Sequence, residues 1–524
     1  MKKKLCALLL GLLLLWGCAP RPERTTVTVA MPYSGQIQNT ETNYYKRWLE
    51  EHTGLRLEIS FIPEAYTEEY LRLFFSNGDS AVDAVFFPLE QHGELAAQIE
   101  ALGREGHLLP LDLAIRQWGE HSAALFADFS EYDLERAITA GDGHIYYLPS
   151  LTPSLAGRNA QTFWINTAWL GKLGLRMPQT VEELRQVLTA FRDGDPNGNG
   201  QGDELPLLGG GTALSRQAAH FLINSFVYDD PRNSYLAVED GRVSFSPATE
   251  GWREAMVYLN SLYRDGLIDP VCFDLDDEQL SQLVLDGREL VGAFAGRGID
   301  DVLGGNASET MSRYSHVPPL AGPDGTRRAT ADATRPLVGG VISAHSPHAR
   351  EVFGLMDLML SQEASLIACY GEEGVDWSRG AAGDLDVFGR PAAIHVQNRV
   401  QNKTLAGAGP MSLSITYRDS VTWSGLFADL EYVNARAALD YQPYLPQEHI
   451  KVLRFTGGAE EDLRLLRREL TAFVEESLRA FLTGAADPND NADWNLYLAR
   501  LDLLGAPKLV AAAQTAYEEM EKKP

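Results

Sequence analysis

The chain has 524 residues, of which 45% are hydrophobic and 22% charged, values that are ordinary for globular proteins. This length exceeds what one average hydrophobic core holds, so two or more lobes are expected. The formal net charge of −27 argues against nucleic-acid binding, which needs a basic face, and against electrostatic attachment to anionic lipid.

The N-terminus predicts export. It reads MKKKLCALLLGLLLLWGC, with three lysines and then an apolar run from Leu5 to Trp16 that is shorter than the roughly 20 residues needed to span a bilayer. A signal peptide over 1–17 is therefore expected. LWGC resembles a bacterial lipobox, although Trp16 stands where small residues are usual. The resemblance implies lipidation of Cys18, a lipidated linker over 18–25 and an extracytoplasmic, cell-membrane lipoprotein. An uncleaved anchor and a plain signal peptide are the alternatives.

Two cysteines remain in the expected mature chain, Cys272 and Cys369. They are far apart in the sequence, so a disulfide and two buried thiols are both open.

The elements expected in chain order alternate between strands and helices. Strands are expected within 26–35, 55–63 and 81–88, with amphipathic helices at 43–54 and 66–78 between them. The alternation recurs through 141–191 and 254–344. One helix is then expected over 348–371, and three more over 460–484, 492–505 and 508–522. Strand–helix–strand order predicts parallel sheets with crossover helices.

WINTAWLGKLGLRMPQTVEELRQVLTAFRDGDPNGNGQGDELPL, residues 164–207, resembles the middle of the large bacterial extracellular solute-binding lipoproteins of ABC sugar importers. This family includes alginate-binding proteins. YRDGLIDPVCF, YGEEGVDW and FLTGAADPNDNADWNLYLARLDLLG fit it too, and VGGVISAHSPHAREVFGLMDLML is similar to the strand-then-helix return of maltose-binding proteins. The resemblance implies an α/β fold, a two-lobed periplasmic-binding-protein-like (type II) clamshell with a helical C-terminal region. Its implied domains are lobe 1, residues 26–150 and 318–371, and lobe 2, residues 151–317 and 372–524.

The same resemblance implies a function. It predicts a monomer that captures an oligosaccharide or related carbohydrate in an interlobe cleft and delivers it to ABC permease subunits. A non-sugar ligand (a peptide or an anionic solute) and an exported polysaccharide-active enzyme are the alternatives. HExxH, GxSxG and P-loop motifs are missing from the sequence, and paired carboxylates carry little information among 72 acidic residues, so no enzyme is expected.

Candidate ligand contacts combine aromatic rings, which match the apolar faces of sugars, with polar side chains, which match their hydroxyl groups. They stand after the first strand, at the edge where α/β sheets bind ligands, and at the expected crossings between the lobes. The candidates are Tyr33, Gln36, Tyr147, Trp164, Asn166, Arg297, Glu373 and Trp377. Each could instead pack in a core or lie on the surface. Arg297 stands where maltose-binding relatives place an aromatic residue, which admits an anionic ligand.

The stretch DPNGNGQGDE, residues 195–204, is rich in the oxygen ligands that calcium prefers. An EF-hand-like register would use Asp193, Asp195, Asn197, the Asn199 carbonyl, Gln201 and Glu204, but it places Gly200 where an apolar residue is usual. The resemblance to the structural calcium loop of alginate-binding relatives implies a second set. That set is Asp195, Asn197, Asn199, the backbone carbonyl of Gln201, Asp203 and Glu204. The second register is preferred because it uses Asp203, and it predicts structural Ca²⁺. A loop without metal is the alternative.

Overall fold

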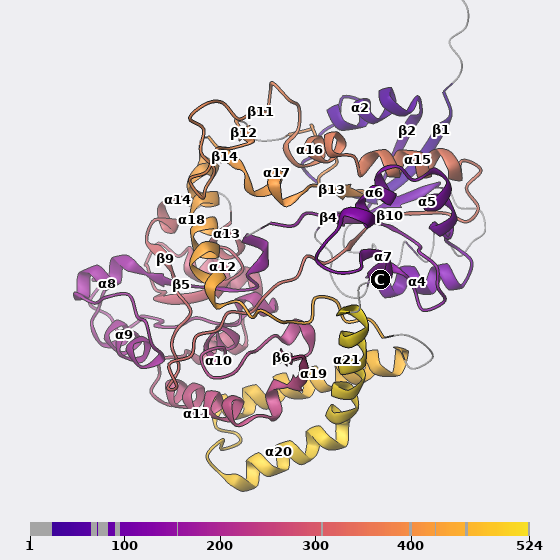
Figure 1. The fold of residues 1–524 in the computed structure, drawn as a ribbon. Coiled ribbons are helices and arrows are strands. Elements are labelled where there is room, and N and C mark those ends of the chain that lie inside the picture. Colours follow the sequence, from indigo (N-terminus) through magenta and orange to yellow (C-terminus); the bar gives the residue numbers. More distant parts are fainter. Residues whose placement is uncertain are drawn as a thin grey trace, which may run out of the picture.

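The structure is a computed structural model, and it describes residues 24–63, 71, 82–89, 95–154, 156–304, 308–397, 401–424, 426–455 and 460–521. The expected signal peptide and Cys18 lie outside the described residues, as does nearly all of the helix expected at 66–78. Two α/β masses stand side by side, with the C-terminal helices packed on one of them and the last of these helices reaching the other (Figure 1).

The first lobe is built on a six-stranded sheet of order β13-β4-β10-β3-β1-β2. Its strands are β1 (Thr26–Pro32), β2 (Arg56–Ile62), β3 (Ala84–Phe86), β4 (Leu148–Leu151), β10 (Leu337–Ile342) and β13 (Met411–Ser412). β1 pairs in parallel with β2 and β3, as expected. β10 runs antiparallel to both β3 and β4, because the chain re-enters this sheet from the other lobe.

Helices cover this sheet and supply the rest of the first core. They are α2 (Tyr44–Thr53), α4 (Leu95–Arg104), α5 (Asp112–Trp118), α6 (His121–Asp128), α7 (Leu134–Ile138), α15 (Ala349–Met359) and α16 (Gln362–Tyr370). α2 shows why the sequence is helical here. Asn43 caps its first turn by accepting from the Lys46 N–H, and Gly54 ends it with a φ of 72°, a left-handed conformation that glycine adopts without strain.

The single helix expected over 348–371 is two helices. α15 and α16 meet at an angle of 72°. Ser361 causes the break by capping the second helix, because its side chain accepts from the Ala364 N–H. In the described part of the chain no single helix is long and apolar enough to cross a membrane, while this bent pair passes on length and composition alone.

The second lobe is built on a three-stranded sheet of order β8-β5-β9, and both of its pairings are antiparallel. Its strands are β5 (Thr162–Asn166), β8 (Ala293–Gly296) and β9 (Tyr314–Val317), and a separate hairpin joins β6 (Leu236–Glu239) to β7 (Arg242–Phe245). The parallel sheet expected here is wrong. Every residue of β5 is buried, and a continuous buried run does not reveal the direction of the neighbouring strands.

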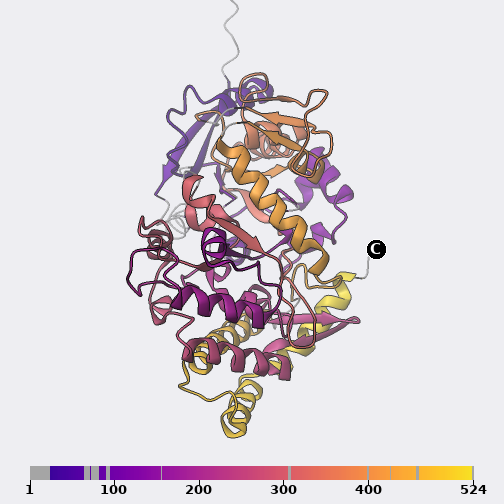
Figure 2. The ribbon, with the colours of Figure 1, turned by 90° about the vertical axis from the view of Figure 1, so that its left-hand side faces the viewer.

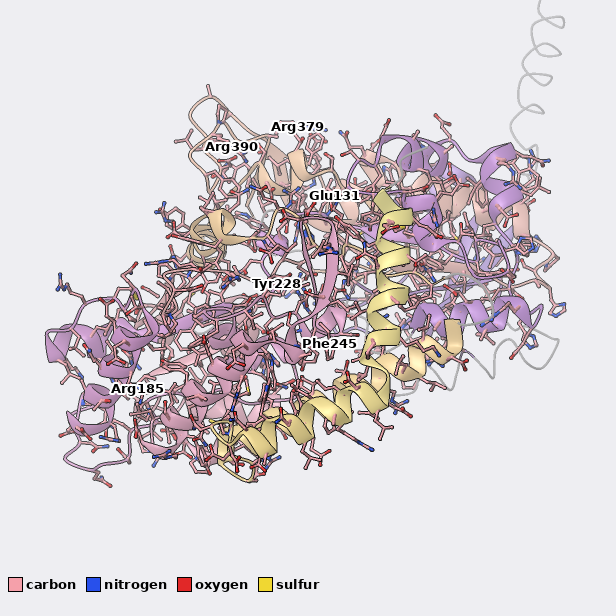
Figure 3. All side chains as sticks on the ribbon, turned by 60° about the horizontal axis from the view of Figure 1, so that its bottom comes forward. Glu131, Arg185, Tyr228, Phe245, Arg379 and Arg390 are labelled. Carbon is pink, nitrogen blue, oxygen red and sulfur yellow. The ribbon has the colours of Figure 1, made fainter. Side chains whose placement is uncertain are left out.

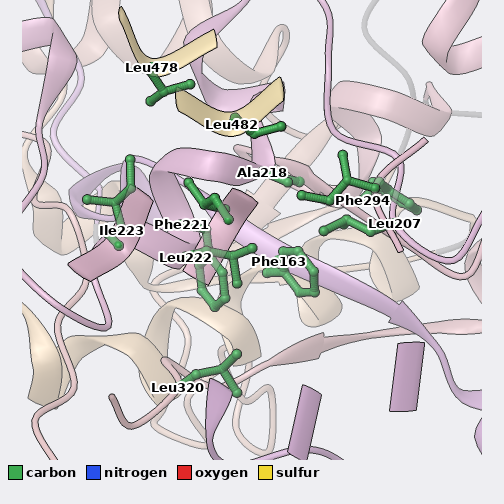
Figure 4. Close-up of a cluster of buried hydrophobic side chains, with 14 of the residues drawn as sticks. Phe163, Leu207, Ala218, Phe221, Leu222, Ile223, Phe294, Leu320, Leu478 and Leu482 are labelled. Carbon is green, nitrogen blue, oxygen red and sulfur yellow. The ribbon is translucent and has the colours of Figure 1, made fainter. Parts of the chain in front are cut away.

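The helices of the second lobe fall into two sets. The first set is α8 (Thr167–Leu173), α9 (Val181–Asp193), α10 (Ala218–Ile223), α11 (Glu250–Arg264), α12 (Asp277–Val284), α13 (Ile299–Leu303) and α14 (Ser308–Met311). The second is α19 (Glu460–Thr483), α20 (Asn491–Leu504) and α21 (Ala506–Glu521), which confirms the helical C-terminal region. Leu478 and Leu482 of α19 join Phe163 and Phe221 in the second core (Figure 4). Trp252 of α11 stacks on Tyr497 of α20, with ring centroids 5.4 Å apart.

The chain changes lobes at places that differ from the expected boundaries. Leu320 and Ala329 pack in the second core, so the return to the first lobe follows them and ends at β10. Leu405 and Met411 pack in the first core, where β13 pairs with β4. Residues 372–424 therefore lie largely with the first lobe rather than the second. They include a small sheet of β11 (Trp377–Arg379), β12 (Ile394–Val396) and β14 (Val421–Trp423), which packs on α16.

A final crossing follows this small sheet. It is the long helix α18 (Leu426–Tyr441), which comes after the short helix α17 (Ile415–Asp419) and β14 and runs obliquely from one lobe to the other (Figure 2). At its far end the Tyr441 hydroxyl accepts from the Phe163 N–H at 3.1 Å and donates to the Val317 carbonyl at 2.6 Å. These two bonds fix α18 to β5 and β9 of the second lobe.

Candidate functional site

Three chain segments join the two lobes, and we call the region where they meet the lobe junction. The segments are 152–161, 332–336 and α18. The Asp332 N–H donates to the Arg158 carbonyl at 2.7 Å, which joins the first two segments. α18 contacts the 3₁₀ turn Ala156–Arg158 of the first segment. In the same central part of the molecule lie Glu131 and Tyr228, between Arg379 and Arg390 on one side and Arg185 on the other (Figure 3).

Four of the predicted ligand contacts are buried in the cores. Tyr147 and Trp164 are fully buried, and Trp164 packs edge-to-face on His316. Asn166 caps α8 by accepting from the Trp169 N–H at 3.1 Å. The Trp377 indole donates to the Gly371 carbonyl at 3.0 Å. These side chains support packing, and in this conformation they have no face open to a ligand.

Two predicted contacts lie at the carboxyl end of β1, as expected. The Tyr33 side chain is 57% exposed and packs edge-to-face on Phe61, with ring centroids 5.6 Å apart. Gln36 is exposed, and its carbonyl accepts from the Asn402 N–H at 3.0 Å. An open aromatic ring beside a polar side chain is what a sugar surface requires.

Glu373 is also exposed, and it pairs with Arg379 at 3.1 Å. Lys403, which follows Asn402 in the chain, forms an ion pair with Glu372. Asn402 and Lys403 therefore link the segment that contains Glu373 to the loop that holds Gln36.

Arg297 is the predicted residue that reaches the lobe junction. It follows β8, and its guanidinium donates to the Asp332 carboxylate at 3.0 Å while the side chain remains 56% exposed. Its backbone N–H donates to Asp301 at 3.0 Å. It can therefore offer hydrogen-bond donors to a ligand while Asp332 holds its position.

The sequence did not indicate α18 as part of the site. Asn434 accepts from the Ile299 N–H at 3.0 Å and donates to Asp300 at 2.8 Å, so it joins α18 to α13. Burial raises the pKa of Glu431, with the Arg418 guanidinium opposing this shift and Asp300 adding to it. Tyr432 beside it is exposed. A helix that crosses between lobes has the same 3.6-residue periodicity as a core helix. The apolar pattern of α18 therefore does not show that it crosses from one lobe to the other.

The 195–204 loop folds around the Asp195 carboxylate. That carboxylate accepts from the backbone N–H groups of Gly198 (3.0 Å), Asn199 (3.1 Å) and Gly200 (3.1 Å). Asp195 itself has a φ of 46°, and Gly198 and Gly200 have φ values of 77° and 74°. These left-handed conformations suit Asp and Gly, and they explain why the loop is built from such residues.

Asp203 and the two asparagines converge on the same side of the loop. Asn197 and Asn199 donate to one Asp203 oxygen at 3.1 and 2.9 Å. The Gln201 N–H donates to the Asn199 side-chain oxygen at 2.7 Å. All of the residues in the second register therefore take part in one compact, oxygen-rich loop, apart from Glu204.

Glu204 gives the strongest indication of a cation. Both of its carboxylate oxygens are buried, and neither forms a hydrogen bond of good geometry. Burial raises its pKa, the neighbouring Asp195 and Asp203 carboxylates raise it further, and the backbone N–H groups of Glu204 and Asn197 oppose the shift. An unpaired buried carboxylate beside two others is costly unless a cation compensates it. The donor set therefore fits calcium.

Asp193 points away from this arrangement. Its carboxylate is exposed and pairs with the Arg192 guanidinium at 2.7 Å, which lowers the pKa of Asp193. The geometry therefore favours the register that starts at Asp195. In the described part of the chain no group of three or more His, Cys, Asp or Glu side chains is close enough to hold a metal alone, so amide and carbonyl oxygens of the loop would have to contribute.

A cavity of about 220 Å³ lies inside the second lobe, apart from the lobe junction. It is lined by the 209–211 loop, Cys272 and residues of α19, including Glu475. Cys272 and Cys369 are both free thiols, the first in the second core and the second within α16. Burial raises the pKa of Cys272 to about 12, so this thiol stays protonated and acts as a small apolar side chain.

His220 of α10 is a buried ionisable group in the same lobe. Its Nδ1 lies 2.7 Å from Asp229 and its Nε2 lies 3.6 Å from Glu475 of α19. Burial alone would lower the pKa of His220, but the Asp229 and Glu475 carboxylates raise it to about 10. The contact between His220 and Glu475 joins α10 to α19, so this group of charges has a structural role.

Two α/β lobes joined by three crossings, with open polar and aromatic side chains beside the crossings, define a protein of the clamshell binding class. Residues 34–365 match the family of bacterial extracellular solute-binding proteins. The chain belongs to this family, and the type II two-lobed fold is confirmed.

Known relatives extend this comparison. The chain is 29% identical over 321 residues to the fructooligosaccharide ABC transporter substrate-binding protein FusA of Streptococcus pneumoniae serotype 4, an alignment that spans 59% of this chain and 55% of the relative. The structure of FusA in complex with kestose covers 95% of this chain and 99% of that chain, with a TM-score of 0.74 at 20% identity. Another FusA structure is described as an EF-hand mutant. The alginate-binding protein AlgQ2 without calcium ion covers 95% of this chain and 99% of that chain, with a TM-score of 0.62 at 20% identity.

Proposed function

We propose that this chain is the extracytoplasmic substrate-binding lipoprotein of an ABC transporter and that it captures an oligosaccharide between its two lobes. The observation that carries the proposal is the family match over residues 34–365, on a fold whose two lobes are joined by three crossings. FusA and AlgQ2 are named for binding a fructooligosaccharide and alginate, and both share this fold. The proposed partners are the permease subunits of the transporter, and the proposed activity is binding without catalysis.

Ligand capture follows from the arrangement of the lobes. The crossing 332–336 has no regular secondary structure and no buried residue, and a short segment of this kind can absorb a change of lobe angle. A ligand that touches both lobes binds the closed form more tightly than the open form, and only this difference in affinity can shift the equilibrium. The closed form would then be the one presented to the permease. Tyr33, Gln36 and Glu373 would contribute from the first lobe, and Arg297 from the second.

We further propose that the 195–204 loop holds structural Ca²⁺. Its ligands would be Asp195, Asn197, Asn199, the Gln201 carbonyl, Asp203 and Glu204, and the buried, unpaired Glu204 carboxylate supports this set. The metal would supply positive charge that the three carboxylates lack. The loop lies directly after α9, away from the lobe junction, so its role would be to stabilise the second lobe.

Binding and closure are tested together. Isothermal titration of the mature protein against kestose and against short alginate and galacturonate oligosaccharides should reveal at least one ligand. With that ligand, small-angle scattering should show a smaller radius of gyration, because the lobes approach each other. If no oligosaccharide binds, the function is wrong. An unchanged radius with a verified ligand would remove the closure mechanism alone.

Membrane attachment is tested at Cys18. We expect Cys18→Ser to move the protein from the membrane fraction to the soluble extracytoplasmic fraction, because the thiol that accepts the lipid is lost. Intact-mass measurement of the wild-type protein should show residues 1–17 removed and a lipid at Cys18. A protein that keeps residues 1–17 and stays in the membrane after the substitution has an uncleaved anchor. Cys6→Ser is the matched control and should change nothing.

A further inference from the structure

A group of arginine side chains lies at the lobe junction of a chain whose formal net charge is −27. Among the charged side chains linked to Asp332 and Glu131, guanidinium groups outnumber carboxylates. Five guanidinium groups surround three carboxylates: Arg158, Arg232, Arg297, Arg335 and Arg467 against Glu131, Asp230 and Asp332. Exposed charges are screened beyond about 8–10 Å at physiological salt, so a ligand at the junction responds to this local excess rather than to the distant acidic surface.

The excess arises because one carboxylate is shared among three arginines. Asp332 lies 2.8 Å from Arg232, 3.0 Å from Arg297 and 3.9 Å from Arg335. Arg232 is the inner partner, and it also approaches Asp230 at 3.6 Å. One negative charge cannot neutralise three positive charges, so the two outer guanidinium groups are only partly compensated.

Arg467, a buried arginine near the junction, also lies in positively charged surroundings. Burial lowers the pKa of Arg467 to about 10, and the nearby Arg335 guanidinium contributes to this shift. Arg467 donates to the Ser234 hydroxyl at 3.0 Å and lies behind the outer arginines. Two further carboxylates adjoin Arg297: Asp301 is paired with Arg216 at 3.2 Å, and Asp300 accepts from the Asn434 amide at 2.8 Å.

Three of the arginines remain accessible, and they come from different segments. Arg158 is on the first crossing, Arg335 is on the second, and Arg297 follows β8 of the second lobe. Their side chains are 42%, 40% and 56% exposed. Arg158 approaches Glu131 only at 3.6 Å, so its hydrogen-bond donors are not fully used. A planar guanidinium matches a carboxylate with two parallel hydrogen bonds, and Arg is the side chain best suited to this task.

We propose that the lobe junction carries a binding site for the carboxylate of an acidic oligosaccharide, formed by Arg158, Arg297 and Arg335. This inference rests on the proposed function and names its substrate class as sugars that contain uronic acid. A carboxylate held here would contact residues of both crossings, so it would favour one lobe angle over another. A small inorganic oxyanion offers the same chemistry, and the test separates the two sources.

The test compares acidic and neutral probes on the full mature protein. Isothermal titration against trigalacturonate and trimannuronate should show at least one of them binding 100-fold more tightly than the neutral kestose. Arg297→Gln and Arg158→Gln should each weaken the acidic ligand about 10- to 100-fold, as expected for a lost hydrogen bond to a charged group, and should weaken it by a larger factor than any kestose binding. Arg56→Gln on the edge strand β2 removes the same charge far from the junction and is the matched control.

The possible outcomes are distinct. Binding of kestose or another neutral oligosaccharide, with no binding of either uronate, overturns this inference and leaves the proposed function standing. Failure of every oligosaccharide overturns both. Uronate binding that neither arginine variant weakens places the carboxylate elsewhere. If sodium sulfate binds, the arginine variants weaken that binding, and neither uronate binds, the site recognises an inorganic anion only and the inference is overturned.

Discussion

Adding calcium to the chelator-treated protein should stabilise the second lobe by about 3–4 kcal/mol when free calcium is 100–1,000 times its dissociation constant. The reason is the Glu204 carboxylate, which is buried without a hydrogen bond of good geometry and lies beside Asp195 and Asp203. A bound cation replaces mutual repulsion with attraction. Magnesium should be a poor substitute, because it demands a compact octahedron and gives up water reluctantly, whereas calcium accepts irregular oxygen geometry. Differential scanning calorimetry with chelator, calcium or magnesium measures the effect.

Two substitutions in the loop should behave differently from each other. Glu204→Gln removes an unpaired buried charge, so in chelator the variant should be as stable as the wild type or more stable, while the gain with calcium disappears. Asp195→Ala should also abolish the gain, but it should lower stability even in chelator. The reason is that Asp195 accepts three backbone hydrogen bonds that organise the loop.

Asp193→Ala is the matched control, because it removes a carboxylate two residues away that pairs with Arg192 on the surface. It should preserve the calcium-dependent gain. If Asp193→Ala is as damaging as Asp195→Ala, the EF-hand register is the correct one. If chelator changes nothing and metal analysis finds no calcium in the purified protein, there is no site.

The residue pattern of the sequence and its family resemblance predicted the overall architecture well, but they predicted the directions of the strands less well. The parallel pairing of β1 with β2 and β3 followed from the strand–helix–strand order at the N-terminus, and the helical C-terminus followed from its periodicity. The antiparallel sheet around β5 did not, because its strands are separated by long stretches of chain and every residue of β5 and β8 is buried. The assignment of 372–424 to the second lobe failed for a related reason. Only the pairing of β13 with β4 shows which sheet this segment joins.

The candidate site also has one part that the sequence predicts and one part that it does not. The 195–204 loop is contiguous, so its residue spacing carries most of its geometry, and the hydrogen-bonded cluster of Asp195, Asn197, Asn199 and Asp203 follows from that spacing. A ligand site between lobes is assembled from distant segments. Trp164 and Trp377 look the same in the sequence as Tyr33, yet the first two are buried and the last is open. The sharing of Asp332 among three arginines depends on how the crossings meet, which no local pattern records.

Replacing His220 with leucine should destabilise the second lobe by about 3–5 kcal/mol, because it leaves the buried Asp229 carboxylate without its partner. His220 and Asp229 are both fully buried and 2.7 Å apart. Leucine has a similar volume, so the loss should come from charge rather than from a cavity. His144→Leu is the matched control. It breaks an exposed His–Asp pair, in which Nδ1 lies 3.1 Å from Asp112, and should cost less than about 1 kcal/mol.

The pH dependence of the free energy of unfolding shows whether His220 is charged or neutral in the folded protein. The Asp229 and Glu475 carboxylates raise the pKa of folded His220 to about 10, above its ordinary value near 6.5. A histidine whose pKa rises on folding stabilises the fold fully below its unfolded pKa and loses that contribution as the pH rises toward the folded value. Burial raises the pKa of Asp229, so in His220→Leu this carboxyl binds a proton itself, and the proper reference is the double variant His220→Leu, Asp229→Leu. Urea unfolding at pH 6.0, 7.5 and 9.0 should therefore give a difference between wild type and this double variant that shrinks steadily over the range. A difference that stays constant would show that His220 is neutral in the fold, held to Asp229 by an ordinary hydrogen bond. The double variant His220→Leu, Asp229→Leu should be more stable than His220→Leu alone, because it removes the carboxylate that the single change leaves unpaired.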